Sequence, residues 1–222
     1  MRAQRRVLAI DIGGNNVKVL LSGQKEARKF PSGPRLTPRR MVAGVKALTR
    51  DWKYDVVSIG YPGVVHGNRI TAEPVNLGRG WVGFSFRAAF RRPVKVVNDA
   101  VMQAIGSYRG GTMLFLGLGT GLGTALVVNG HVVPMELGHF PYKKTTIETH
   151  IGTGGLKHLG INRWRKLVAE VIGEFVSAFL VDDVVLGGGN VKKLARLPKH
   201  CRAGGNANAF LGGFRLWETD AR

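Results

Sequence analysis

Short runs of aliphatic residues, each followed by a glycine-containing turn, recur along the chain. Residues 7–12 form the first run, and residues 17–21 lead back after the turn at residues 13–16. Two such runs joined by a turn predict a β-hairpin. Residues 26–30 extend this pattern as a third strand. We therefore expect the chain to begin with a β-meander.

The same arrangement returns in the second half of the chain. Residues 113–118, a glycine-rich turn and residues 124–128 repeat the strand, turn and strand of the opening. The Asn129-Gly130 pair then favours a tight hairpin turn into a further strand at residues 131–133. This coarse internal duplication predicts an α/β protein with two domains, each starting with a meander.

Helices are predicted where apolar residues recur at helical spacing. Thr37 can cap a helix that begins at Pro38, with an apolar face made of Met41, Val42, Val45, Leu48 and Trp52. Asn162 can cap a second helix, with a face made of Trp164, Leu167, Val168, Val171, Ile172, Phe175, Val176 and Phe179. A final helix is predicted over residues 206–217. We expect these faces to be core and not a cofactor site.

One predicted strand ends in a pair of polar residues. Further strands are predicted at residues 55–60, 94–97 and 183–186, the last of these closing the series. Residues 94–97 run directly into Asn98 and Asp99, and a helix follows. Ligands bind at the carboxyl ends of strands in open α/β sheets, where a carboxylate can reach a substrate hydroxyl. Asp99 is therefore a candidate general base, and the alternative is an ordinary helix N-cap.

Three glycine-rich turns follow hydrophobic strands, at residues 13–16, 119–123 and 187–190. Glycine lets backbone N–H groups approach phosphate oxygens closely, so the turns indicate a phosphate or nucleotide site. None is a Walker A loop, because the chain has no Gly-Lys pair, and none fits the dinucleotide fingerprint. Asp11 and Thr120 add polar groups to two of the turns. The alternative is that the glycines only serve tight hairpins with positive φ.

Several carboxylates and amides suit a polyhydroxylated ligand, because each can accept or share hydrogen bonds with sugar hydroxyls. These residues are Asn76, Asn98, Asp99, Glu136, His139 and Glu148. Glu136 and His139 could also be half of a metal site, but no third ligand is spaced to complete it. A lone histidine is more often structural. The single cysteine, Cys201, excludes an internal disulfide and a cysteine-cluster metal site.

The charge of the chain is unusual. Lysine and arginine number 33 against 14 acidic residues among 222, which gives a net charge of +19. Such a balance favours a polyanionic partner, and the alternative is a general enrichment in arginine without a partner. Candidates for a basic groove are Lys18, Arg79, Lys143, Lys144, Lys192 and Lys193, each of which could equally be solvated surface charge. No apolar run is long enough to span a membrane, so we expect a cytoplasmic protein.

Five segments together resemble the sugar kinases of the ROK family. They are Asp11-Ile12-Gly13-Gly14, Asn98-Asp99-Ala100, Leu116 to Gly123, Glu136-Leu137-Gly138-His139 and Leu186-Gly187-Gly188-Gly189. The resemblance covers nearly the whole chain in the right order. It implies the actin-like two-domain ATPase fold with a cleft between the domains. Residues 141–148, 159–165 and 206–217 resemble most closely the short polyphosphate-dependent glucokinase branch.

The resemblance implies a role for each candidate residue. Asp99 would take the proton from the 6-hydroxyl of a hexose, glucose or mannose, and Asp11 would orient Mg²⁺ or its waters. The other sugar hydroxyls would be held by Asn76, Asn98, Glu136, His139 and Glu148. The phosphates of ATP or polyphosphate would lie at Gly13, Gly14, Asn15, Lys18, Gly119, Thr120, Gly121, Gly188 and Gly189. No structural zinc is expected, because the cysteines of the family's zinc motif are absent.

The resemblance also implies domains at residues 1–110 and 111–205, with a C-terminal helix within 206–222 packing on the first, and a homodimer. Asn15 departs from the Thr or Ser usual in the phosphate loop, and residues 150–154 also depart from the branch. Two alternatives therefore stay open: a strictly ATP-dependent kinase for another hexose, and a catalytically weak sugar- or nucleic-acid-binding protein. No winged-helix segment precedes Val7, so we do not expect a repressor.

Overall fold

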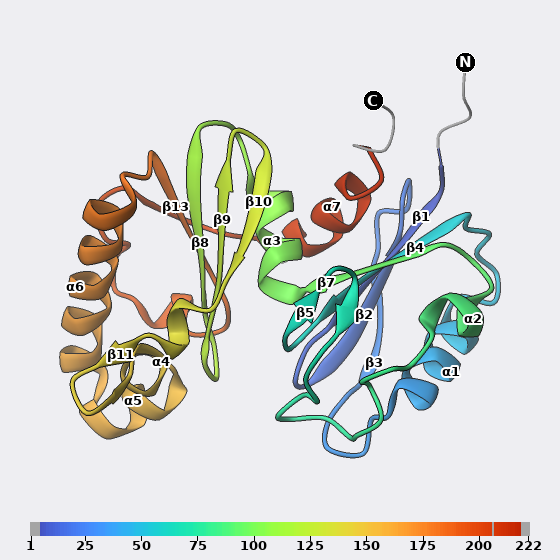
Figure 1. Cartoon of the computed structure of the whole chain (residues 1–222), viewed down its shortest axis with the longest axis horizontal. Helices are drawn as coiled ribbons and strands as arrows, with labels where there is room; N and C mark the ends of the chain where they lie inside the picture. Colours follow the sequence, from blue (N-terminus) through green and yellow to red (C-terminus); the bar gives the residue numbers. More distant parts are fainter. Residues whose placement is uncertain (1–4, 206, 219–222) are drawn as a thin grey trace. The chain divides into compact units, whose positions relative to one another are not determined.

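The computed structural model describes residues 5–205 and 207–218. The chain forms two compact units, and each is built on a five-stranded sheet (Figure 1). Among the described residues, the first unit comprises 5–102 and 209–218, and the second comprises 103–205 and 207–208.

The sheet of the first unit has the order β3-β2-β1-β4-β7. Its strands are β1 (Val7–Ile12), β2 (Asn16–Leu21), β3 (Arg28–Pro31), β4 (Val56–Tyr61) and β7 (Val94–Asn98). The first three pair antiparallel, while β1, β4 and β7 run parallel. The predicted opening meander is therefore confirmed, and two parallel strands extend it.

Helices cover both faces of this sheet. Leu8, Ile10 and Ile12 of β1 face a core closed by α1 (Pro38–Leu48) and α2 (Phe86–Phe90). The predicted cap of α1 is confirmed, because the Thr37 hydroxyl accepts a hydrogen bond from the backbone N–H of Arg40 at 3.4 Å. A small hairpin, β5 (Val65–His66) with β6 (Arg69–Ile70), and a long loop connect β4 to α2.

The other face of the sheet carries α7 (Asn208–Arg215). Close contact needs a glycine there, because a Cβ at Gly213 would lie 2.7 Å from the Cβ of Ala9. The fully buried hydroxyl of Ser58 donates to the carbonyl of Gly213 at 2.6 Å and accepts from the Trp217 indole N–H at 2.8 Å. The described part of the predicted C-terminal segment thus packs on the first unit. Asn206 and residues 219–222 of that segment lie outside the described residues.

The second unit repeats the strand plan of the first, with the order β10-β9-β8-β13-β14. Its strands are β8 (Thr112–Leu118), β9 (Leu122–Val128), β10 (His131–Met135), β13 (Asp183–Gly187) and β14 (Cys201–Ala203). Three strands form an antiparallel meander, and β8, β13 and β14 run parallel. Asn129 and Gly130 both have positive φ, 49° and 83°, as a tight hairpin turn requires. The predicted duplication is confirmed.

One long helix, α6 (Ile161–Phe179), covers a face of the second sheet (Figure 1). Its predicted stripe is confirmed, with Trp164, Val168 and Val171 fully buried. Shorter elements surround it: η1 (Leu137–His139), β11 (Pro141–Tyr142), β12 (Thr145–Thr146), α4 (Ile147–Ile151), α5 (Thr153–Leu159) and η2 (Val191–Lys193). Within the described ranges, no helix combines the length and apolar character that a membrane span needs.

Four local predictions were wrong. Trp52 is not on α1, which ends at Leu48, but it packs on the same core from the turn that follows. Asn162 lies inside α6, and Gly160, with φ of 73°, precedes that helix instead. β3 extends to Pro31 because it is an edge strand, where proline needs no ladder donor. The strand at residues 183–186 is not the last, since β14 follows it.

The contacts of Ser58 predict the stability of the first unit. Ser58→Ala should lower the free energy of unfolding by about 1–3 kcal/mol, because it leaves a buried carbonyl and an indole N–H without their partner. Urea unfolding followed by tryptophan fluorescence measures this. The control is Ser177→Ala at an exposed position of α6, where the Ser177 hydroxyl donates to the Gly173 carbonyl of the same helix at 3.0 Å. A loss no larger than that of the control would contradict the prediction.

Candidate active site

Asp11 and Asp99 lie at the same end of the first sheet, where its parallel strands have their carboxyl ends. β1, β4 and β7 run parallel, so their carboxyl ends coincide. Asp11 is paired with Gly60 across β1 and β4, and Tyr61 is paired with Asn98 across β4 and β7. The first glycine turn and the predicted general base therefore follow two parallel strands of one sheet, β1 and β7, which are separated by β4.

Asn98, and not Asp99, caps the helix that follows β7. Its Oδ1 accepts hydrogen bonds from the backbone N–H groups of Ala100 at 2.8 Å and Val101 at 3.3 Å. Its Nδ2 donates to the Gly63 carbonyl at 3.0 Å. The Asn98 amide thus joins α3 (Asp99–Ser107) to the loop after β4, and its expected contact with a sugar hydroxyl stays a prediction.

Asp99 is the first residue of α3. The N-cap alternative for Asp99 is wrong, because Asn98 takes that position. One Asp99 carboxylate oxygen accepts from the Ala100 N–H at 2.9 Å. A helix N-terminus favours negative charge, so this position stabilises an ionised carboxylate that can accept a proton.

Gly60 lets the start of α3 approach the sheet. A Cβ at this position would lie 2.5 Å from Met102 Cε and 3.5 Å from Asp99 Cα. A larger residue at this position of β4 would therefore push the Met102 side chain aside and fill the space next to the start of α3. The sequence analysis did not single out Gly60, although the glycine that interrupts a run of buried residues was a signal for such an approach.

Asp11 is a carboxyl with an unfavourable environment for its charge. Burial raises the pKa of Asp11, and Lys18, which is paired with it across β1 and β2, opposes that rise. In the described part of the chain, no group of three or more His, Cys, Asp and Glu side chains could hold a metal ion. Mg²⁺ is usually bound by one or two carboxylates with waters and substrate phosphates, so a single carboxylate fits that ion.

The first glycine turn leaves open space beside its backbone. No atom lies within 4 Å of a Cβ built at Gly14, and the φ of Gly14 is not positive. A tight turn therefore does not explain glycine there, whereas close approach of a ligand would. The turn is anchored by Ser32, whose hydroxyl donates to the Gly13 carbonyl at 2.6 Å and whose N–H donates to the Asn15 carbonyl at 3.0 Å.

The second glycine turn is held by two residues that the sequence analysis missed. The Gly119 carbonyl accepts from the Thr153 N–H at 3.0 Å, from the Thr153 hydroxyl at 2.9 Å and from Asn190 Nδ2 at 3.0 Å. The buried Asn190 also donates to the Thr153 hydroxyl, at 3.0 Å. These bonds fix the turn from β8 to β9, with Thr120 exposed on it. The asparagine directly after three glycines was the available signal.

The third glycine turn lies beside the second. The Asn190 N–H donates to the Leu118 carbonyl at 3.0 Å. Gly188 has a φ of 85°, and a Cβ there would clash with the Leu118 carbonyl, so the turn itself requires this glycine. Gly119 and Gly189 differ, because their φ values are not positive and no atom lies within 4 Å of their Cβ positions. Those two positions leave room for a phosphate.

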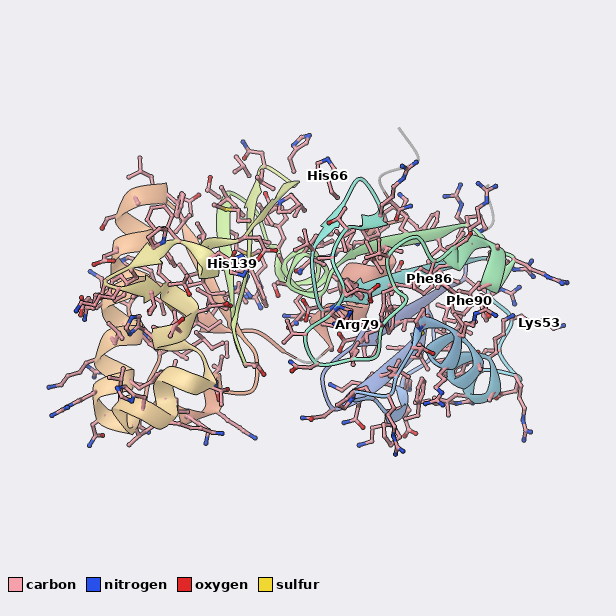
Figure 2. All side chains as sticks on the ribbon, turned by 60° about the horizontal axis from the view of Figure 1, so that its bottom comes forward. Lys53, His66, Arg79, Phe86, Phe90 and His139 are labelled. Atoms are coloured by element: carbon pink, nitrogen blue, oxygen red, sulfur yellow. The ribbon has the colours of Figure 1, made fainter. Side chains whose placement is uncertain are left out.

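Three predicted sugar-binding residues gather next to the second turn. His139 Nε2 lies 3.6 Å from Glu148 Oε1, and the other carboxylate oxygen of Glu148 accepts a hydrogen bond from the Leu122 N–H at 3.4 Å and occupies the space that a Cβ at Gly121 would need. The pKa of Glu136 is raised, first by burial and then by Glu148, while His139 opposes the rise. Figure 2 labels His139, which is on η1 between β10 and β11. Acceptors and donors for hydroxyl groups thus adjoin a phosphate-type turn within the second unit.

Asn76 belongs to a different part of the first unit. It is exposed on the loop that connects β6 to α2. The Glu73 carboxylate organises this loop by accepting from the N–H groups of Gly80, Trp81 and Val82. Arg79, labelled in Figure 2, is exposed on the same loop. The role of Asn76 in sugar binding stays a prediction.

The predicted basic groove residues are spread over both units. Lys18 is half-buried beside Asp11, and Arg79, Lys143, Lys144, Lys192 and Lys193 are exposed. The ammonium of Lys143 lies 5.2 Å from the centroid of the Tyr142 ring. Exposure leaves these cations available to an anionic ligand, and a common groove for them stays a prediction.

The hydrogen bonds around Gly119 predict a specific sensitivity of the second unit. Thr153→Val should lower the free energy of unfolding by about 1–3 kcal/mol, because one bond to the Gly119 carbonyl and one acceptor of Asn190 are lost. Urea unfolding measures this. Thr149→Val is the control, since its exposed hydroxyl bonds only to Thr146. Equal effects of the two substitutions would contradict the prediction.

The raised pKa of the half-buried Asp11 carboxyl predicts a pH-dependent gain of stability when this side chain is made neutral. Because its pKa is raised on folding, its contribution is fully present below the unfolded pKa and is lost as pH rises through the folded pKa. Asp11→Asn should therefore raise the thermal midpoint at pH 7, and the gain should vanish near the ordinary aspartate range of about pH 4.

Asp55 is a matched control of opposite sign for this measurement. Its pKa is lowered, mainly by the hydrogen bond from the Arg6 N–H. Asp55→Asn should therefore lower the midpoint at pH 7 or leave it unchanged, as expected of an exposed pair. If Asp11→Asn also lowers the midpoint at pH 7, burial is not the dominant influence on Asp11.

The sequence of this chain is similar to a family of known proteins. A profile described as "ROK family" matches residues 7–155. The polyphosphate glucokinase of Mycobacterium tuberculosis is 26% identical over 216 residues, which cover 86% of this chain and 80% of that protein. The bifunctional enzyme NanE/NanK of Brucella melitensis is 29% identical over 141 residues, which cover 57% of this chain and 27% of that enzyme.

Solved structures resemble this chain over nearly its whole length. The inorganic polyphosphate/ATP-glucomannokinase of Arthrobacter sp. strain KM has a TM-score of 0.83 at 21% identity, covering 97% of this chain and 99% of that chain. A ROK family glucokinase of Streptomyces griseus, in complex with glucose and AMPPNP, has a TM-score of 0.78 at 16% identity, covering 96% and 99%. The predicted actin-like ATPase fold is confirmed, and the chain belongs to the ROK family.

Proposed function

We propose that this chain is a sugar kinase that transfers a phosphoryl group from polyphosphate or ATP to the 6-hydroxyl of a hexose. Glucose is the expected acceptor, and mannose is a second one. The observation that carries the proposal is the position of Asp99, at the first turn of α3 and at the carboxyl end of the sheet that also bears Asp11. The similarity to a polyphosphate glucokinase over 86% of the chain supports the donor.

Asp99 acts as the general base in this proposal. As the 6-oxygen of the sugar forms its bond to the terminal phosphorus, the hydroxyl proton passes to the Asp99 carboxylate. The bond from that phosphorus to the bridging oxygen breaks, and the shortened donor leaves with the electron pair. Phosphoryl transfer asks little else of a protein than positioning and charge stabilisation. The backbone bonds of Asn98 hold the turn that carries the base.

The glycine turns serve the donor in this proposal. Among the described residues, no side chain beyond the adjacent residues lies within 4 Å of the Cβ positions of Gly14, Gly119 and Gly189, so phosphate oxygens can approach the backbone closely there. Thr120 and Asn15 are exposed on two of these turns, and Lys18 adds positive charge near the first. Asp11 is the residue that would hold Mg²⁺, directly or through water. The ion, when bound, neutralises charge that develops on the transferred group.

The acceptor is held by residues of the second unit. Glu148, fixed against Gly121 and near His139, and the partly desolvated Glu136 offer acceptors to sugar hydroxyls. Asn98 and Asn76 of the first unit complete the proposed set. A homodimer and a cytoplasmic location remain expectations from the sequence.

Two other functions deserve tests. A strictly ATP-dependent kinase for another hexose would use the same base and the same turns. A catalytically weak sugar- or nucleic-acid-binding protein is favoured by Asn15, which gives the first turn an amide where a hydroxyl is usual, and by the net charge of +19. Turnover with different donors and sugars separates these cases.

Asp99→Asn should abolish most of the turnover. We expect kcat for glucose 6-phosphate formation to fall by about 10²- to 10⁴-fold, the usual contribution of a general base. The KM for the sugar should change little, because the amide keeps the size of the side chain. The assay uses glucose and mannose with ATP or long-chain polyphosphate. Asp51→Asn, which removes an exposed carboxylate paired with Arg28, is the control and should keep full activity.

The outcomes distinguish the proposals. Turnover with polyphosphate that disappears in Asp99→Asn supports the donor and the base together. Turnover with ATP alone supports the kinase and rejects the polyphosphate donor. No turnover with either donor, accompanied by salt-dependent nucleic-acid binding, would favour the binding protein.

A further inference from the structure

A basic groove lies on the second unit, beside the segment that follows the third glycine turn and η2. It has a volume of about 560 Å³ and runs between α6 and the segment that follows η2. Three of its lining residues are cationic: Arg165, Arg196 and Lys199. The other described lining residues are alanine, leucine and proline, and none of those described is acidic or aromatic. A groove of this composition attracts anions through its charge alone.

The walls of the groove are fixed by packing. Leu194 and Leu197 pack against the core of the second unit, which holds the segment after η2 to the protein. Arg165 Nε donates to the Lys193 carbonyl at 2.8 Å and joins α6 to this segment. Arg196 and Lys199 remain exposed. The groove therefore presents exposed cations on an anchored backbone.

The acidic residues of α6, Glu170 and Glu174, lie on the side of the helix that faces β11 and not the groove. Glu170 accepts a hydrogen bond from the Tyr142 hydroxyl at 3.3 Å. The pKa of Tyr142 is raised by burial, by Glu170 and by the negative charge of Glu174. The cations of the groove are thus separated from the carboxylates of the same helix.

Only η2 separates the segment that lines the groove from the third glycine turn, which is proposed to bind phosphate. Asn190 bonds to Leu118 and Gly119 at the second glycine turn, and η2 follows it directly. Lys193, the last residue of η2, accepts the bond from Arg165. A chain of phosphates that starts at the glycine turns can therefore reach the groove along one continuous segment of the second unit.

We propose that this groove binds the distal part of an inorganic phosphate chain whose reacting end lies at the glycine turns. The inference rests on the proposed function, because it gives the polyphosphate donor a path beyond the transferred group. A phosphate chain suits the groove better than a nucleic acid does, since no aromatic side chain among the described lining residues is available for base stacking. The groove accordingly selects long donors over short ones.

Binding is measured without turnover, with fluorescently labelled long-chain polyphosphate and the full chain. The double variant Arg196→Gln and Lys199→Gln removes two exposed cations of the groove. Each phosphate contact on a single strand releases about 0.7 counterion, so two contacts correspond to about a 20-fold loss of affinity at 0.1 M salt. The slope of log affinity against log salt should become shallower by about 1.4.

A control variant removes the same charge elsewhere. Arg39→Gln and Lys46→Gln affect exposed residues of α1 in the first unit. This control should lose far less affinity than the groove variant. Equal losses in the two variants would overturn the proposal, because net charge and not the groove would then govern binding.

Kinetics provide a second readout. In the groove variant, the KM for long-chain polyphosphate should rise, while the KM for tripolyphosphate or ATP and every kcat stay unchanged. If no donor supports turnover in the native chain, the proposed function fails, and the binding measurement still decides on the groove. The same measurement is made with a single-stranded oligonucleotide. If it binds the native chain as tightly as polyphosphate does, and if the groove variant loses affinity for both ligands equally, the proposed selectivity for a phosphate chain is overturned.

Discussion

Parallel pairing next to a meander is the constraint on which the candidate site depends. In each unit the first strand of the meander also pairs in parallel with later strands, β1 with β4 and β8 with β13. Parallel pairing places the carboxyl ends of these strands at the same end of the sheet, so residues that are tens of positions apart in the sequence lie at one end. Asp11 and Asp99 share such an end in the first unit, as do the second and third glycine turns in the other.

Polar groups at these ends are held mainly by backbone atoms. Asn98 bonds to three backbone groups, and the Gly119 carbonyl accepts three hydrogen bonds from Thr153 and Asn190. Such satisfied bonds fix the turns without a ligand, which reduces the ordering that binding would require. Burial of Asp11 acts in the other direction, because it disfavours the charge that a cation would stabilise. The site thus combines rigid turns with one carboxyl whose charge is costly until a cation arrives.

The sequence predicted the elements whose signal is local. Continuous apolar runs identified β1 and β8, and an apolar stripe at helical spacing identified α6. Each of these elements is buried through residues that are close together in the sequence, so its pattern can be recognised locally. β14 has only three residues and its Arg202 bonds to Asp183, so no apolar pattern marks it. Likewise, asparagine and aspartate are equally favoured as N-cap residues, so the sequence could not decide between Asn98 and Asp99. The hydrogen bonds from the Ala100 and Val101 N–H groups to the Asn98 side chain identify Asn98 as the cap. Thr153 and Asn190 were missed because their link to Gly119 spans 34 and 71 positions.

The link between Ser58 and α7 also affects the order in which the chain can fold. Ser58 lies in a central strand, but its partners Gly213 and Trp217 are 155 and 159 positions away. During synthesis from the N-terminus, all of residues 103–208 emerge before these partners do. The second unit can therefore complete its core while one face of the first sheet is still uncovered, and closure of that face must wait until Gly213 and Trp217 have been synthesised.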